Sequence, residues 1–168
     1  DFVVAHPSAN PKAVAVALSR GAFEFQGQKC SAASRAYLPK SLWPAIEGFM
    51  REDLDSMKMG NPENFTNFIN AVIDEKSFDK LKSYIDDVAK SPDAKIIAGG
   101  KCDKSIGYYI EPTIILTTNP DYVTLCEELF GPVLTIYVYD DADYDQILHK
   151  VDQTSDYALT GAVFAKER

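Results

Sequence analysis

The hydrophobic positions of the chain follow two periods that alternate from one end to the other. In the first long segment they recur at spacings of four, four and three, which places them on one face of a helix: Val14, Leu18, Ala22 and Phe25. Asn10 is a good N-cap, Pro11 suits the first helical position, and Gly27 can end a helix. We therefore expect a helix between Asn10 and Gly27, with Phe25 on its buried face.

Three further segments have helical periodicity. We expect Ser41 to cap the second helix, with Pro44 tolerated in its first turn. The apolar stripe of that helix consists of Leu42, Ile46, Phe49, Met50 and Leu54. A third helix is expected from about Asp74 to Lys90, and its inner face carries Phe78, Leu81, Ile85 and Val88. The fourth is marked by Tyr144, Ile147, Leu148 and Val151.

Short apolar runs between these helices predict strands, at residues 1–6, 33–38, 95–98, 108–116, 133–139 and 159–165. Pro112 breaks the fourth run, which indicates an edge or a bend. The run 133–139 is apolar on both faces, as in a strand covered by helices on either side. Residues 57–72 are rich in Asn, Pro and Gly and are expected to form a loop. Strands that alternate with helices predict an α/β three-layer domain, in which helices flank a mainly parallel sheet.

Composition and charge exclude several classes of protein. The chain has 168 residues, enough for about one domain, and 46% of them are hydrophobic. Its net charge is −8, and an acidic surface without a basic run repels phosphate backbones, so we expect no nucleic-acid partner. No apolar stretch approaches the roughly 20 residues of a membrane span, so we expect no membrane partner.

Three cysteines do not make a disulfide framework, so we expect free thiols in a reducing compartment. Their spacings are too long for a zinc knuckle, and no metal site is predicted. The N-terminal residues show no targeting signal, and neither end resembles a natural terminus. We therefore expect the chain to be a piece of a longer polypeptide.

Cys30 is the first candidate for chemistry. It follows Gly27-Gln28-Lys29 just beyond the first helix. A free cysteine is more often a small buried hydrophobe than a nucleophile. The loop position favours the nucleophile, and nearby Lys29 and Arg35 could stabilise a thiolate. Cys102 and Cys126 have no such setting and are interpreted as structural. His6 and His149 have no partner pattern and are interpreted as structural or surface residues.

The second candidate is the stretch Glu127-Glu128-Leu129-Phe130-Gly131-Pro132. Two carboxylates beside an aromatic residue usually form a solvated turn. Alternatively, a carboxylate accepts hydrogen bonds from two sugar hydroxyls while the aromatic side chain packs against a flat ring. Spacing alone does not decide between these interpretations.

Three motifs in order, residues 27–30, 107–113 and 127–133, resemble the NAD(P)-dependent aldehyde dehydrogenase superfamily over essentially the whole chain. Residues 22–25, 30–35, 41–44 and 71–74 resemble more narrowly the Δ1-pyrroline-5-carboxylate, or glutamate-γ-semialdehyde, dehydrogenases. The resemblance implies NAD-dependent oxidation of glutamate semialdehyde, a small-molecule substrate, to glutamate in proline catabolism.

The resemblance also assigns roles to individual residues. Cys30 corresponds to the nucleophile, which forms a thiohemiacetal and then a thioester. Glu128 corresponds to the residue that holds the nicotinamide ribose of NAD, and Phe130 to the aromatic beside it. Ser31 corresponds to a hydroxyl that contacts the substrate carboxylate.

In the superfamily, the water-activating Glu, the oxyanion Asn and the nucleotide-binding domain precede the region that this chain resembles. A substrate-anchoring loop and an oligomerisation segment follow it. Residues 1–168 are thus expected to be a partial catalytic domain, inactive when isolated, from a soluble homo-oligomeric enzyme. The expected location is the cytoplasm in a bacterium or the mitochondrial matrix in a eukaryote. An aldehyde dehydrogenase with another substrate remains the alternative.

Overall fold

A six-stranded sheet forms the centre of the computed structural model, which describes residues 1–157 and 159–166. Its strands, in the order β3-β6-β7-β2-β1-β8, are β1 (Phe2–Ala5), β2 (Arg35–Pro39), β3 (Ala94–Ala98), β6 (Thr113–Thr117), β7 (Val133–Tyr139) and β8 (Gly161–Phe164). Neighbouring strands are parallel except at one edge, where β3 runs antiparallel to β6. The predicted mainly parallel sheet is confirmed.

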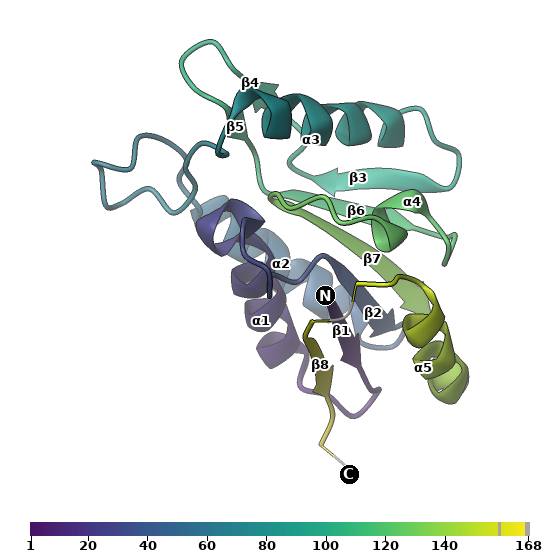
Figure 1. Ribbon diagram of the computed structural model, residues 1–168. Coiled ribbons are helices and arrows are strands. Elements are labelled where there is room, and N and C mark those ends of the chain that lie inside the picture. The colour runs from purple at the N-terminus through teal and green to yellow at the C-terminus, as the bar shows by residue number, and fades with distance from the viewer. Residues whose placement is uncertain (158, 167–168) are drawn as a thin grey trace.

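Helices cover both faces of this sheet (Figure 1). They are α1 (Pro11–Phe23), α2 (Trp43–Ser56), α3 (Glu75–Val88), the single turn α4 (Val123–Cys126) and α5 (Tyr144–Gln153). Two 3-10 turns, η1 (Glu24–Gly27) and η2 (Asp141–Asp143), lie after α1 and before α5. A small antiparallel pair, β4 (Cys102–Asp103) and β5 (Tyr109–Ile110), lies beside α3. No helix in the described ranges is long and apolar enough to cross a bilayer.

Alternate side chains of each strand point to opposite layers, because the side-chain period of a strand is two. On β7, Leu134 and Ile136 join the core beneath α1 and α2. Val133 joins the core beneath α3, and Tyr139 joins the core beneath α5. The strand is therefore covered on both faces, as its sequence predicted, and the three-layer α/β fold is confirmed.

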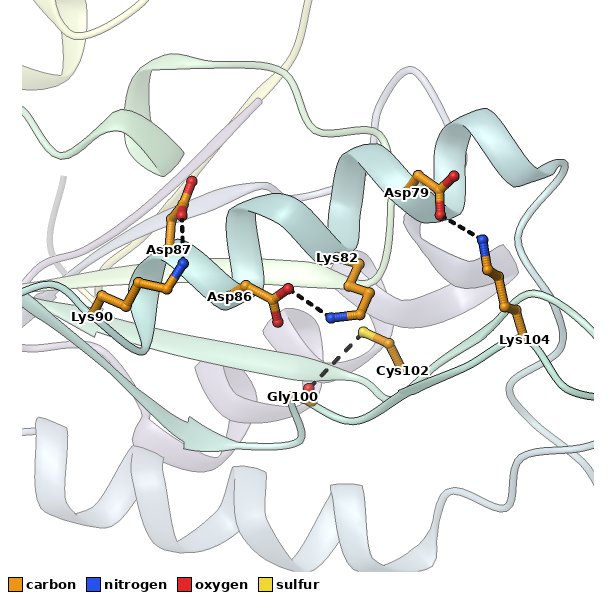
Figure 2. Close-up of polar contacts among 8 residues, drawn as sticks. All are labelled: Asp79, Lys82, Asp86, Asp87, Lys90, Gly100, Cys102 and Lys104. Atoms are coloured by element: carbon orange, nitrogen blue, oxygen red, sulfur yellow. Dashed lines mark hydrogen bonds and ion pairs between the residues drawn. The ribbon is translucent and has the colours of Figure 1, made fainter.

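Helix α3 follows its sequence pattern closely. The Asp74 side chain accepts a hydrogen bond from the Ser77 backbone N–H at 2.7 Å and caps the helix. All four residues of the predicted inner face are buried: Phe78, Leu81, Ile85 and Val88. On the outer face, the Lys104 ammonium pairs with Asp79 at 3.1 Å (Figure 2). It also reaches Glu75 at 3.0 Å, so the β4–β5 loop is attached to the helix at two residues.

Several local expectations are wrong. The first helix ends at Phe23 and not at Gly27, and Phe25 is 74% exposed because the backbone changes handedness there. Leu42 occupies the N-cap of α2, while the Ser41 N–H donates to Asp141 Oδ1 at 3.0 Å. The predicted strand 108–116 is interrupted at Pro112: β5 ends at Ile110, β6 begins at Thr113, and the two belong to different sheets. The pattern did not predict α4 or β4, which are too short to show a period.

Candidate active site at the amino edge of the sheet

The two candidate motifs meet because they precede neighbouring strands. Cys30 lies shortly before β2, and Glu128 and Phe130 lie shortly before β7. These strands are parallel and adjacent, with Arg35 opposite Thr135, so both loops approach the same edge of the sheet. Ligands of open α/β sheets usually bind at the carboxyl ends of the strands. This site lies at the amino ends.

Three of the four predicted site residues line one narrow cavity. Cys30, Glu128 and Phe130 surround a space of about 20 Å³, together with Gly27 and Gly131. This is room for about one water molecule, so a larger ligand would lie across its mouth. Both Glu128 and Phe130 are exposed there. Ser31, the fourth predicted residue, is exposed and does not line the cavity.

Glycines allow the two loops to touch through their backbones. A Cβ added to Gly27 would lie 2.2 Å from the carbonyl oxygen of Gly131. Gly27 also has a φ of +64°, in the left-handed region that glycine adopts without steric cost. A Cβ added to Gly131 would in turn lie 2.4 Å from the methyl groups of Leu81. Residues 24–34 (the cysteine loop) therefore pack against residues 127–132 (the acidic loop), which in turn pack against α3.

The backbone on both sides of this contact is strained. Phe25 and Gln26 have φ values of 51° and 58°, so with Gly27 they form three consecutive left-handed residues. Phe130 has a φ of 59°. A non-glycine residue in this region costs about 1–3 kcal/mol, and such strain persists only where surrounding contacts impose it. The strained residues here lie in the two loops that form the cavity.

The surroundings of the Cys30 thiol favour its ionised form, the thiolate. Lys29 Nζ donates to Cys30 Sγ at 3.0 Å, and this hydrogen bond is the largest cause of a lowered pKa at the exposed Cys30 thiol. The backbone N–H groups of Cys30 and Ser31 lower the pKa further. The expectation for Lys29 is supported, whereas that for Arg35 is wrong. The Arg35 guanidinium is buried and donates to the Leu125 carbonyl at 3.2 Å.

The surroundings of the other two thiols favour the neutral form. Burial raises the pKa of both Cys102 and Cys126, which are partly buried. Figure 2 shows the Cys102 thiol beside Lys82, whose ammonium pairs with Asp86 at 2.6 Å. Burial outweighs this nearby positive charge. Both cysteines fit the structural interpretation.

The histidines also fit a structural or surface role. His6 Nδ1 accepts a hydrogen bond from the Ser8 backbone N–H at 3.1 Å, and its ring packs edge-on against Tyr144. His149 is exposed on α5. Within residues 1–157 and 159–166, no three His, Cys, Asp or Glu side chains gather as metal ligands.

Two contacts that support the site were not predicted from the sequence. Lys80 of α3 donates to the Glu128 carbonyl oxygen at 2.7 Å. Gln28 Oε1 accepts a hydrogen bond from the Ile73 backbone N–H at 2.8 Å. In each case the partner is a backbone group more than 40 residues away, and residue types do not reveal such a partner.

Comparison with known proteins identifies the class. The aldehyde dehydrogenase family model matches residues 1–168, and the chain belongs to the aldehyde dehydrogenase family. Among curated relatives, the mitochondrial Δ1-pyrroline-5-carboxylate dehydrogenase of Dictyostelium discoideum is 52% identical over 165 residues, covering 98% of this chain and 30% of its own length. The corresponding human enzyme is 47% identical over 169 residues, covering 100% of this chain and 30% of its own length.

Solved structures give the same result. The Δ1-pyrroline-5-carboxylate dehydrogenase of Mycobacterium tuberculosis superposes with a TM-score of 0.91 at 40% identity, over 100% of this chain and 30% of that protein. The same enzyme has been solved with NAD bound. The narrower likeness predicted from the sequence is confirmed. The chain spans about 30% of the length of these relatives.

The backbone contact at Gly27 leads to a stability prediction. Gly27→Ala should destabilise the chain by about 1–3 kcal/mol through its left-handed φ alone, with a further cost for displacing the Gly131 carbonyl. Gly48→Ala, in the middle of α2 with no atom within 4 Å of the added Cβ, is the matched control and should stabilise by about 0.5–1 kcal/mol. Urea unfolding of both variants measures the difference. Equal stabilities would contradict the packing described here.

The setting of the thiols leads to a reactivity prediction. Brief sub-stoichiometric iodoacetamide should label mainly Cys30, because the thiolate is the reactive form. Lys29→Met removes the hydrogen bond that lowers its pKa, so the midpoint of the alkylation rate should move to higher pH and the rate at pH 7 should fall. Mass spectrometry after labelling at several pH values measures both effects. Cys102 in the same molecule is the internal control, and preferential labelling of Cys102 would contradict the assignment.

Proposed function

We propose that the chain is the part of a Δ1-pyrroline-5-carboxylate dehydrogenase that carries the nucleophile, and that this enzyme oxidises glutamate-γ-semialdehyde to glutamate with NAD⁺. One observation carries the proposal. The exposed Cys30, with a lowered pKa, lies in one cavity with Glu128 and Phe130, within a chain that belongs to the aldehyde dehydrogenase family. The relatives named above supply the substrate class.

In this proposal Cys30 acts through covalent catalysis. Its thiolate adds to the aldehyde carbon, and the carbonyl oxygen becomes the oxyanion of a thiohemiacetal. The backbone N–H of Cys30 donates to that oxyanion, together with an Asn side chain from elsewhere in the enzyme. NAD⁺, when bound, would supply the hydride acceptor that converts the thiohemiacetal into a thioester. The remaining thioester on Cys30 reacts with water, which releases the carboxylic acid and regenerates the thiol.

Glu128 and Phe130 would hold the nicotinamide end of the cofactor. The exposed Glu128 carboxylate can accept hydrogen bonds from two ribose hydroxyls, and the half-exposed Phe130 ring offers an apolar surface for a flat ring. The strained φ of Phe130 supports a functional role for this turn. The narrowness of the cavity means that most of the cofactor would be bound by other parts of the enzyme.

Ser31 would contact the substrate. It is exposed beside Cys30 but outside the cavity that Glu128 lines, so substrate and cofactor would approach the thiol from different sides. A carboxylate-bearing aldehyde needs polar partners, because an unpaired buried charge is costly. If Ser31 only packs locally, an aldehyde dehydrogenase with another substrate is the second candidate.

Residues 1–168 would then form a partial catalytic domain of a homo-oligomeric enzyme, in the cytoplasm of a bacterium or the mitochondrial matrix of a eukaryote. Because the chain spans about 30% of its relatives' length, the isolated chain is proposed to be an inactive folded module. The activity is therefore tested in the complete enzyme.

Glu128→Gln in the complete enzyme tests the cofactor role. Loss of charge-assisted hydrogen bonds worth about 1.5–3 kcal/mol should raise the KM for NAD⁺ or slow hydride transfer by roughly 10- to 150-fold. Cys30 should still be alkylated. The neighbouring Glu127→Gln, which removes the same charge outside the Cys30 cavity, is the control and should leave NAD⁺ kinetics unchanged. Unchanged kinetics in Glu128→Gln would return this residue to the solvated-turn interpretation.

Ser31→Ala in the complete enzyme tests the substrate class. A hydrogen bond to a charged group sets the expected loss in kcat/KM for glutamate semialdehyde at roughly 10- to 150-fold. Propanal has no carboxylate, so its kcat/KM should change much less. An equal loss for both aldehydes would contradict the substrate assignment and leave the aldehyde dehydrogenase proposal intact.

A further inference from the structure

The left-handed turn before Cys30 directs two glutamine side chains at one distant segment. Gln26 Oε1 accepts a hydrogen bond from the Asn70 backbone N–H at 2.9 Å. Gln28 Oε1 accepts one from the Ile73 backbone N–H at 2.8 Å. Gln28 is two residues from the thiol, so its hydrogen bond is the nearer of the two to Cys30. The reactive loop is thus attached by side chains to residues 70–73.

Residues 58–73 are a firm attachment point although they lack regular secondary structure. Ile69 and Val72 are buried in two different cores, at 0% and 2% exposure. The Ile69 N–H donates to the Lys58 carbonyl at 3.0 Å, and the Val72 N–H donates to the Tyr108 carbonyl at 2.9 Å. The segment is therefore fixed to the protein interior at both of these residues.

Helix α3 connects this attachment point to the acidic loop. Ile73 directly precedes Asp74, the N-cap of α3. Further along the same helix, Lys80 donates to the Glu128 carbonyl and Leu81 packs against Gly131. Ile73, just before the N-cap of α3, thus holds the cysteine loop, and the middle of the helix holds the acidic loop. One rigid element fixes the spacing between Cys30 and Glu128.

We propose that Gln28 is a positioning residue for Cys30. Its amide oxygen accepts a hydrogen bond from the Ile73 N–H and so holds the thiol at a fixed position relative to Glu128, through α3. The inference rests on the proposed function, because it assigns Gln28 a part in the same reaction. Displacement of a reacting group by about 1 Å can lower a rate by roughly 100-fold. The hydrogen bond therefore matters for the turnover rate more than for folding.

Two variants of the complete enzyme distinguish the effect of the hydrogen bond on kcat from the effect of side-chain packing. Gln28→Met retains the length of the side chain but lacks the oxygen acceptor. Gln28→Glu retains an oxygen that can accept from the Ile73 N–H. Glu adds a charge that raises the pKa of the thiol, so kcat is compared on the high-pH plateau of each variant. Asn67→Ala is the control, because it removes a hydrogen bond to the Asn61 carbonyl within the same segment, far from Cys30 in the chain.

Gln28→Met should lower plateau kcat roughly tenfold or more, with the KM for NAD⁺ within about twofold of wild type. Its Tm should fall no further than that of Asn67→Ala, which should retain wild-type kcat. Gln28→Glu should recover most of the lost rate. Amide hydrogen exchange at Ile73 should accelerate in Gln28→Met and remain protected in Gln28→Glu.

Three results would overturn the proposal: wild-type kcat in Gln28→Met, equal damage in Gln28→Met and Gln28→Glu, or equal losses of kcat in Gln28→Met and Asn67→Ala. The first shows that the hydrogen bond has no kinetic role, the second that side-chain shape matters instead, and the third that loop stability explains the loss. A wild-type enzyme without aldehyde oxidation would contradict the proposed function. The exchange of the Ile73 amide would then still report whether Gln28 holds the loop.

Discussion

The contact between the backbones at Gly27 and Gly131 is the constraint on which the site depends. Any side chain at Gly27 would overlap the Gly131 carbonyl, so the cysteine loop and the acidic loop approach as closely as two chains can. Leu81 lies against the far side of Gly131 and prevents the acidic loop from moving away. Steric exclusion thus limits how the two loops can approach, and this limit does not weaken with ionic strength or pH.

The two loops that form the site have strained backbones, whereas the helix and strands around them are regular. Phe25, Gln26 and Phe130 have left-handed backbones, which would relax in an isolated peptide. Gln26 is held by its hydrogen bond from the Asn70 N–H, just ahead of α3, and the loop of Phe130 is held by Lys80 and Leu81 of α3. The regular elements of the fold therefore stabilise two loops whose own conformations are unfavourable.

Sequence patterns predicted what depends on local periodicity. The buried face of α3 and the doubly covered β7 follow from the spacing of apolar residues, and Cys30 stood out in its loop. The left-handed turn was missed because Phe25 and Gln26 are ordinary residues whose φ is imposed by tertiary contacts. Spacing left the role of Glu128 open, and its proximity to Cys30 depends on the order of strands, which is set by crossover connections. The family resemblance, and not the pattern, singled out Glu128.

The pairing of β2 with β7 has a consequence for biosynthesis. Arg35 pairs with Thr135, a hundred positions later in the chain, so the sheet edge that brings the two loops together has a high contact order. During translation α1, the left-handed turn and Cys30 emerge long before β7 does. A nascent chain therefore exposes the thiol and its lysine without the acidic loop, and the site is assembled only when most of the chain has been synthesised. We therefore expect this domain to fold, and the candidate site to form, late in synthesis.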